Sequence, residues 1–232
     1  MGERISRRNW ILIWVLGLAG QICWNIENSW FNTFVYDKIT KDPAVISWMV
    51  GTSAIVSTLA AFLIGTWSDR AGRRKPFIAV GYICWGLFTI AFGATEFLPK
   101  DPLIVAIVCI VAADAVMSFF GSTGYDAGFN AWTTDISHPR NRGKLGGALA
   151  ALPVFATIFG AVVSGMLVEA FDFFPFFTLM GGIVMLTGVA SLFALRDHEG
   201  LKAKRSDRGY WHQFAEVFRV RTVVENRELF WV

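Results

Sequence analysis

The sequence has few charged residues, few histidines and few cysteines. Charged side chains make up 17% of its 232 residues, against about a quarter in soluble domains. This low share disfavours a soluble globular protein or a nucleic-acid partner. The sequence also lacks HExxH and GxSxG patterns, which disfavours a membrane enzyme. The only cysteines lie in apolar stretches without disulfide or metal-ligand spacing, so we interpret them as free thiols: Cys23, Cys84 and Cys109.

Long apolar runs occupy most of the chain instead. A bilayer core requires about 20 apolar residues in helical form, and six segments meet this requirement. They are Trp10–Phe34, Ala44–Trp67, Pro76–Leu98, Leu103–Thr134, Leu145–Val168 and Phe173–Leu195. Lipid offers no hydrogen-bond partner to the backbone, so each segment must be a helix. The sequence predicts an all-α membrane protein with six transmembrane helices, embedded in a lipid bilayer.

The basic residues predict the orientation of these helices. Fifteen basic residues lie at the two ends of the six-helix unit and in its second and fourth loops, whereas the other three loops hold three, which are Lys38, Lys41 and Lys100. Basic loops stay in the cytoplasm. We therefore expect a multi-pass protein of the cell membrane, with its N-terminus and the segment after the sixth helix in the cytoplasm.

A weak internal repeat relates the two halves of the unit. Glycines at equal spacing, with a Pro-Phe pair between them, occur in residues 65–81, which join the second and third helices, and in residues 165–181, which join the fifth and sixth. The first joint is strongly basic and the second has no basic residue. Two copies that cross the membrane in opposite directions would differ in this way. The pattern predicts two inverted three-helix repeats.

The composition changes near residue 200, which divides the chain into three regions. Residues 1–199 form the six-helix unit. Residues 200–228 are charged, but Tyr210, Phe214 and Phe218 recur every four residues, which predicts a cytoplasmic amphipathic linker helix at the headgroup level. Binding of a protein partner is the alternative for this linker. Residues 229–232 are apolar and are interpreted as the start of a truncated seventh helix.

The second loop contains a distinctive motif. It has a glycine, three residues, Asp-Arg, one residue, a second glycine and then basic residues. The members are Gly65, Asp69, Arg70, Gly72, Arg73 and Arg74. Gly65 would allow close helix approach, Gly72 a tight reversal, and Asp69 a contact with a helix N-terminus or a basic side chain.

This motif resembles the signature of the major facilitator superfamily, and residues 5–232 resemble the N-terminal six-helix half of its twelve-helix fold. The resemblance implies that the loop is a gating element that clamps two halves together, with the partner of Asp69 in a missing C-terminal half. Residues 130–135 (Asn-Ala-Trp-Thr-Thr-Asp), followed by Arg142 and Gly143, are similar to sugar:cation symporters of the glycoside–pentoside–hexuronide type.

The resemblance implies a secondary active transporter that works by alternating access and moves a small polar solute, such as a sugar, with a cation. No cofactor is expected beyond the coupling ion, H⁺ or Na⁺. The alternative is a membrane sensor or assembly protein that has the same half-fold but transports nothing. In the superfamily, the first and fourth helices line the central cavity, so their polar residues are the candidates for a solute site.

Four amides lie on one side of the first helix. At about 100° per residue, Gln21, Asn25, Asn28 and Asn32 fall within about 60° of one another. Amides are costly against lipid and suit a hydroxylated or ionic solute, although hydrogen bonding between helices would also explain them. Trp24, close to this stripe, could stack on a sugar ring, while packing or an interfacial position is the default role of any tryptophan here.

The fourth helix has a similar polar stripe that includes Ser122, Asp126 and Asn130. A carboxylate that faces lipid at the bilayer centre costs about 2.5–3.5 kcal/mol even on gentle scales, so we expect the acidic residues of the helices to face protein or water. Asp126 is the first candidate for the coupling cation. Asp114 and Glu27 lie about 120° from their stripes on straight helices, and a structural role is an alternative for both.

Overall fold

The computed structural model describes residues 5–99, 101–197 and 203. Within these residues the chain is helical throughout, without strands, and six spans are long and apolar enough to cross a membrane. They are Arg7–Ile39, Pro43–Ala71, Lys75–Phe97, Leu103–Asp135, Arg142–Phe171 and Phe173–Ala194. The six predicted helices are confirmed. The predicted linker and the start of a seventh helix lie outside the described residues, apart from Ala203.

Three of the spans contain π-helical turns and are therefore not regular α-helices. The first comprises α1 (Arg7–Ile26), α2 (Asn32–Phe34) and the π-helical turns Glu27–Phe31 and Val35–Ile39. The fourth comprises α5 (Leu103–Gly121), the π-helical segment Ser122–Phe129 and α6 (Asn130–Asp135). The fifth comprises α7 (Arg142–Phe159), the π-helical turn Gly160–Ser164 and α8 (Gly165–Phe171). The others are α3 (Pro43–Ala71), α4 (Lys75–Ala94) with a 3₁₀ turn (Thr95–Phe97), and α9 (Phe173–Ala194).

The helix ends follow from local sequence. Asp42 accepts a hydrogen bond from the Ala44 backbone N–H and precedes Pro43, the first residue of α3. At the other end of α3, Gly72 has φ 61° and ψ 33°, and its N–H donates to the carbonyl oxygens of Ser68 and Asp69. Glycine adopts this left-handed conformation without steric cost. The tight reversal expected at Gly72 is confirmed.

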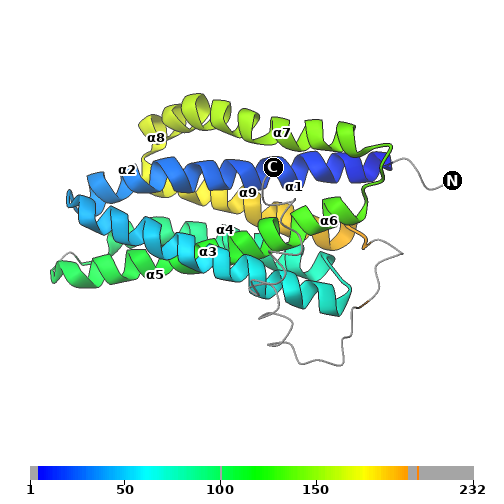
Figure 1. The fold of residues 1–232 in the computed structure, drawn as a ribbon. Coiled ribbons are helices and arrows are strands. Elements are labelled where there is room, and N and C mark those ends of the chain that lie inside the picture. Colours follow the sequence, from blue (N-terminus) through cyan, green and yellow to red (C-terminus); the bar gives the residue numbers. More distant parts are fainter. Residues whose placement is uncertain (1–4, 100, 198–202, 204–232) are drawn as a thin grey trace, which may run out of the picture.

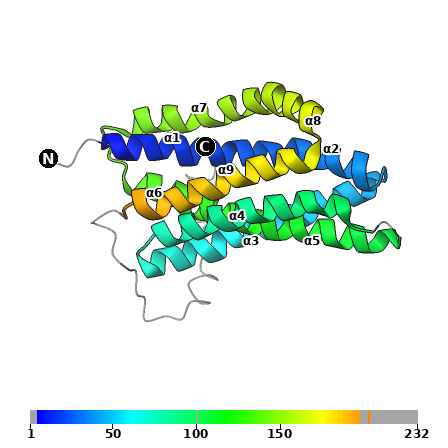
Figure 2. The same ribbon diagram turned by 180° about the vertical axis from the view of Figure 1, so that it is seen from behind.

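The packing of the spans follows an inverted repeat (Figures 1 and 2). At the centre, α4 packs along α9. In the first repeat unit's contacts, α3 packs on α5, and in the second, α7 packs on α1 in the same way. Likewise α4 packs on α5, and α9 packs on α1. Exchanging the first three spans for the last three thus reproduces the same set of neighbours. This is the arrangement predicted from the repeat in the sequence.

The central pair of helices approaches closely at two glycines. A Cβ on Gly86 would collide with the carbonyl oxygen of Gly181, and one on Gly181 would collide with the carbonyl oxygen of Gly86. Small residues allow backbones to meet in this way, and such contacts hold membrane helices together where lipid removes the hydrophobic driving force. This close contact between α4 and α9 holds the two repeats together.

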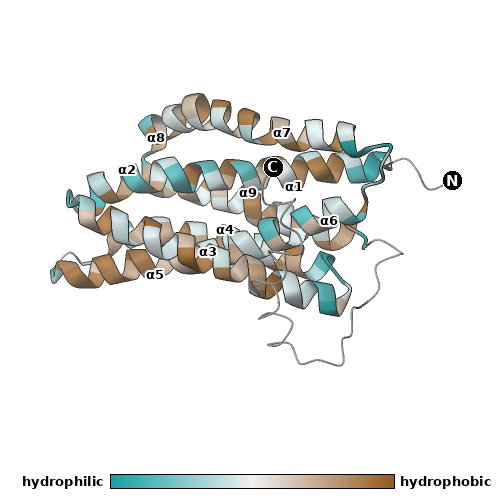
Figure 3. Ribbon diagram, viewed as in Figure 1, coloured by the Kyte–Doolittle hydropathy of each residue, from teal (hydrophilic) through white to brown (hydrophobic). Residues whose placement is uncertain are grey.

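The surface of the bundle is apolar between polar ends. Figure 3 shows hydrophilic residues at the two ends of the bundle and along part of the first span. Large apolar side chains point outward between these ends, among them Trp48 at 74% exposure and Phe193 at 83%. An outward apolar surface of this kind is suited to lipid. The chain is a multi-pass membrane protein.

Candidate functional site

Glu27 lies inside the bundle near two other carboxylates, Asp114 and Asp126. Glu27 is the first residue of a π-helical turn in the first span, Asp114 lies on α5, and Asp126 lies in the π-helical segment of the fourth span. The charges of Asp114 and Asp126 both act on Glu27. On a straight helix Asp114 and Asp126 would point about 120° apart. The π-helical segment turns less per residue than an α-helix, which brings them closer to one face.

Serine hydroxyls accompany each carboxylate. Ser118 donates a hydrogen bond to Oε1 of Glu27 over 2.7 Å, which links the first and fourth spans. Asp114 is 1% exposed and lies beside Ser53 of α3, while Asp126 lies beside Ser122. Among the described residues, no hydrogen-bond partner reaches Oε2 of Glu27 or Oδ1 of Asp114, and both atoms are buried. Two carboxylate oxygens of the site are therefore buried without a hydrogen bond from the described residues.

The amide stripe of the first span divides into separate contacts. The Gln21 amide donates to the Tyr125 hydroxyl of the fourth span over 2.9 Å. The amides of Asn28 and Asn32 instead donate to carbonyl oxygens of their own helix, four residues earlier. Asn25 lies against Gly160, where a Cβ would collide with its Oδ1. The four amides thus have different partners, one on the fourth span, two on their own helix and one against the fifth span.

A polar groove runs between the first and fifth spans. It has a volume of about 280 Å³ and contains an amide and three hydroxyls, from Asn25, Ser29, Thr33 and Thr157. Of these residues, the sequence analysis identified only Asn25. A signal was present, since Asn25, Ser29 and Thr33 recur every four residues on one helix. Nothing in the sequence pointed to Thr157, which faces them from another span.

Other predicted solute ligands have structural contacts. Trp24 packs on Trp85 with ring centroids 5.0 Å apart, as expected of a packing residue. Ser122 is fully buried and donates to the carbonyl oxygen of Ser57 in α3 over 2.7 Å. Asn130 is exposed, and its backbone carbonyl accepts from the hydroxyls of Thr133 and Thr134. Trp24 and Ser122 thus hold the bundle together in this structure.

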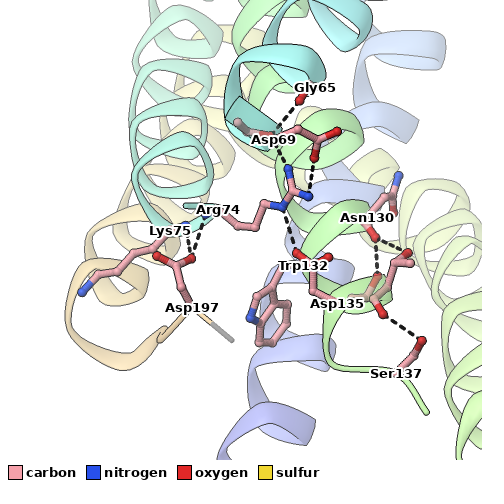
Figure 4. Close-up of polar contacts among 12 residues, drawn as sticks. Gly65, Asp69, Arg74, Lys75, Asn130, Trp132, Asp135, Ser137 and Asp197 are labelled. Atoms are coloured by element: carbon pink, nitrogen blue, oxygen red, sulfur yellow. Dashed lines mark hydrogen bonds and ion pairs between the residues drawn. The ribbon is translucent and has the colours of Figure 1, made fainter. Parts of the chain in front are cut away.

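The signature loop forms a compact ionic network around Arg74 (Figure 4). Its guanidinium pairs with Asp69 through Nη2, with Asp135 through Nε over 2.9 Å, and with the Ser68 hydroxyl through Nη1. Arg74 is only 5% exposed. The network joins the end of α3 to the end of α6. Asp69 thus has a basic partner inside this loop, in addition to any partner that the resemblance places in a second half.

A second carboxylate joins this loop to the sixth span. Oδ1 of Asp197 accepts hydrogen bonds from the backbone N–H groups of Arg74 and Lys75, over 2.8 and 2.9 Å. These groups are at the start of α4, where a carboxylate is favoured by the helix dipole and by unpaired N–H groups. No pattern in the sequence pointed to Asp197. Of the remaining motif residues, Arg73 is exposed and Arg70 is half-buried.

The close helix approach expected at Gly65 is wrong for the described part of the chain. No atom beyond its own helix and its chain neighbours lies within 4 Å of a Cβ placed there. The physical reason is that no described element packs against this side of α3. Within the described bundle, Gly65 therefore leaves an open place on the surface.

Comparison of the chain with known proteins identifies its family. Residues 13–232 match the model of the Major Facilitator Superfamily. The chain is 22% identical over 200 residues to the human MFS-type transporter SLC18B1, which covers 86% of this chain and 42% of that protein. It is 26% identical over 164 residues to the rat protein of the same name, covering 69% of this chain and 34% of that protein. The chain thus spans less than half the length of these curated relatives. It belongs to the major facilitator superfamily of transporters.

Proposed function

We propose that the protein is a secondary active transporter in which cation movement drives a small polar solute by alternating access. The observation that carries cation coupling is the group of three carboxylates inside an apolar bundle. Every basic residue of the described part lies at a helix end or in a loop, so no cation among the described residues lies beside them. Ionisable groups within a membrane are expensive and are found on ion and proton pathways.

The solute that fits best is uncharged and hydroxylated, and a sugar is the leading candidate. The groove of Asn25, Ser29, Thr33 and Thr157 offers hydrogen bonds without a formal charge. Ser29 of this groove and Glu27 belong to the same π-helical turn, Glu27–Phe31, so solute and cation can both influence that turn. The resemblance of residues 130–135 to sugar:cation symporters supports the same class.

A second six-helix half would supply the other wall of the cavity. The polar groove is open on one side, and Gly65 lies on a helix face without neighbours in the described bundle. Membrane-buried polar groups need protein or water, so a partner half would cover this face. We place the protein in the cell membrane, with the basic end around Arg74 in the cytoplasm.

Counterflow in proteoliposomes tests the transport proposal. The full-length protein is reconstituted and loaded with unlabelled mono- and disaccharides, and entry of the radiolabelled sugars is followed. In Asp126→Asn we expect uphill accumulation to be lost, while solute exchange stays measurable. Asp101→Asn, in an exposed loop, is the matched control and should behave as wild type. Absence of counterflow for every solute tested would favour the sensor or assembly alternative.

A further inference from the structure

Four basic side chains lie where the first and fifth spans begin. Arg7 and Arg8 are in the first turn of α1, and Arg142 and Lys144 are in the first turn of α7. All four residues are exposed. Among the described residues, no carboxylate forms an ion pair with any of them. Their charges therefore face the surroundings of the bundle.

The packing of α1 against α7 brings these side chains together. The two helices lie side by side and begin at the same end of the bundle (Figures 1 and 2). A Cβ on Gly17 would collide with Leu152. A Cβ on Gly160 would collide with Asn25. Both pairs are 135 residues apart in the sequence, so the helices run in the same direction and their first residues lie level with each other.

The helix ends make these charges costly for the bundle alone. The N-terminus of a helix carries a partial positive charge, which disfavours basic residues in the first turn and favours acidic ones. Neither α1 nor α7 has an acidic residue there. The described carboxylates of this end have other partners. Asp69 and Asp135 pair with Arg74, and Asp197 accepts from the start of α4. An anion from outside the described chain would compensate the four charges.

Hydrogen-bond donors without acceptors lie at the same place. No side chain caps the start of α7, although the first N–H groups of a helix have no partner within it. Asn141, directly before α7, is 8% exposed, and its Nδ2 has no acceptor among the described residues. Its Oδ1 accepts from the His138 backbone N–H. A helix N-terminus with unpaired donors suits the oxygens of a phosphate group.

The apolar surface beside this place favours a phospholipid as the source of the phosphate. Ile11 lies one turn further along α1 and is 62% exposed. Deeper in the bundle, Trp14 and Phe155 pack edge to face across α1 and α7, with ring centroids 5.9 Å apart. An acyl chain can follow this surface. The linker is a poor alternative occupant, because residues 200–228 contain seven basic and four acidic residues.

We infer that Arg7, Arg8, Arg142 and Lys144 form a binding site for the phosphate headgroup of an anionic phospholipid. The uncapped start of α7 and the Asn141 amide supply donors to the phosphate oxygens, and the acyl chains lie along α1 and α7. Basic pockets between transmembrane helices on the cytoplasmic side suit such headgroups. The inference goes beyond the proposed function and does not depend on transport.

Native mass spectrometry of the purified full-length protein in detergent tests this site. The protein is titrated separately with phosphatidylglycerol and phosphatidylcholine of the same acyl chains, so that only the headgroup differs. We expect the wild type to bind phosphatidylglycerol in preference to phosphatidylcholine. Arg142→Gln should weaken phosphatidylglycerol binding about fivefold, the contribution of one cation near an anionic surface. Arg7→Gln/Arg142→Gln should weaken it about 25-fold, and neither variant should change phosphatidylcholine binding.

Arg73→Gln is the matched control for Arg142→Gln. It also removes one exposed cation from the same end of the bundle, but Arg73 follows α3, which lies on the far side of the bundle from α7 (Figures 1 and 2). Its phosphatidylglycerol binding should equal that of wild type. Glycerol 3-phosphate has the anionic group without acyl chains, and at the same concentration it should not displace phosphatidylglycerol.

Four results would overturn the inference. Equal binding of the two lipids by the wild type would do so without depending on the folding of any variant. A loss in Arg73→Gln as large as that in Arg142→Gln would indicate a general attraction to the basic end. Displacement by glycerol 3-phosphate would identify a soluble phosphorylated ligand. Unchanged phosphatidylglycerol binding in Arg7→Gln/Arg142→Gln would place the lipid elsewhere on the protein.

Discussion

The two polar ends of the bundle use the same arrangement in different surroundings. At one end, Arg74 lies between Asp69 and Asp135. At the other, Lys38 lies between Glu96 and Asp172, with Nζ–O distances of 2.9 and 2.6 Å. The side chain of Arg74 is 6% exposed, whereas those of Lys38 and Asp172 are 25% and 55% exposed. At each end one cation joins two carboxylates, but only the cation of the first end, Arg74, is buried.

The inverted repeat explains why the two ends resemble each other. Arg74 lies in the joint between the second and third spans, and Asp172 in the corresponding joint between the fifth and sixth. Asp135 ends the fourth span and Lys38 lies near the end of the first, so these residues also correspond, with the charges exchanged. A guanidinium can hold two carboxylates with a planar set of donors, while an ammonium is a point charge. The buried end therefore has the residue suited to burial.

The first way to sharpen this comparison is to establish which end is in the cytoplasm. In a background with alanine at the three native cysteines, we expect Ala71→Cys to react with a membrane-impermeant maleimide only from the cytoplasmic side. Asp101→Cys should react only from outside. Both positions are exposed, so the expected difference in labelling between the two sides is all or none. Labelling of Ala71→Cys from outside would reverse the orientation proposed from the basic loops.

The second way is to remove the buried cation. Arg74→Met leaves Asp69 and Asp135 facing each other without compensation. Breaking a fully buried pair costs about 3–5 kcal/mol, and we expect the lower end, about 3 kcal/mol, because the Asp69 side chain is 45% exposed. Thermal unfolding in detergent, followed by circular dichroism, measures the loss.

Arg74→Lys is the matched control for this experiment. It keeps the charge but loses the planar donors, so its stability should lie between those of wild type and Arg74→Met. Equal stability of wild type and Arg74→Met would mean that the network around Arg74 contributes little to the fold.

The sequence predicts the helices well because the relevant signals are local. Apolar length predicts each span, and Gly72 predicts the reversal at the end of α3. Segregated basic residues and spaced glycines also predict the repeat, which the packing confirms. None of these signals requires knowledge of a distant neighbour.

The site was less predictable because it depends on contacts between spans. A Cβ on Gly81 would collide with the backbone of Gly124, so α4 packs closely on the fourth span where that span becomes π-helical. No local pattern predicted that change of pitch, so angles counted at a constant 100° per residue do not apply across Ser122–Phe129. Ser118 and Thr157 were missed for a related reason, because each is recognised only with a residue of the first span. Ser118 donates a hydrogen bond to Glu27, and Thr157 lines the same groove as Asn25.

The last way to break the comparison is to remove the exposed cation. Lys38→Met should cost only about 0.2–1 kcal/mol, the range of exposed ion pairs. Added salt should reduce this cost, because exposed pairs are screened, whereas the cost of Arg74→Met should hardly change. Thermal unfolding at low and high sodium chloride measures both. A cost for Lys38→Met as large as that for Arg74→Met would show that burial does not distinguish the two ends.

The exposed end should also be sensitive to acid. The Lys38 ammonium, followed by the Phe173 backbone N–H, lowers the pKa of Asp172 below its ordinary value. A carboxyl group with a lower pKa in the folded state stabilises the fold above the unfolded value, about 3.9, and this contribution is lost as the pH falls through the folded value. Asp172→Asn keeps the helix cap but not the charge. We therefore expect its stability to fall less than that of wild type below about pH 4, and identical acid profiles of the two proteins would contradict this role of Asp172.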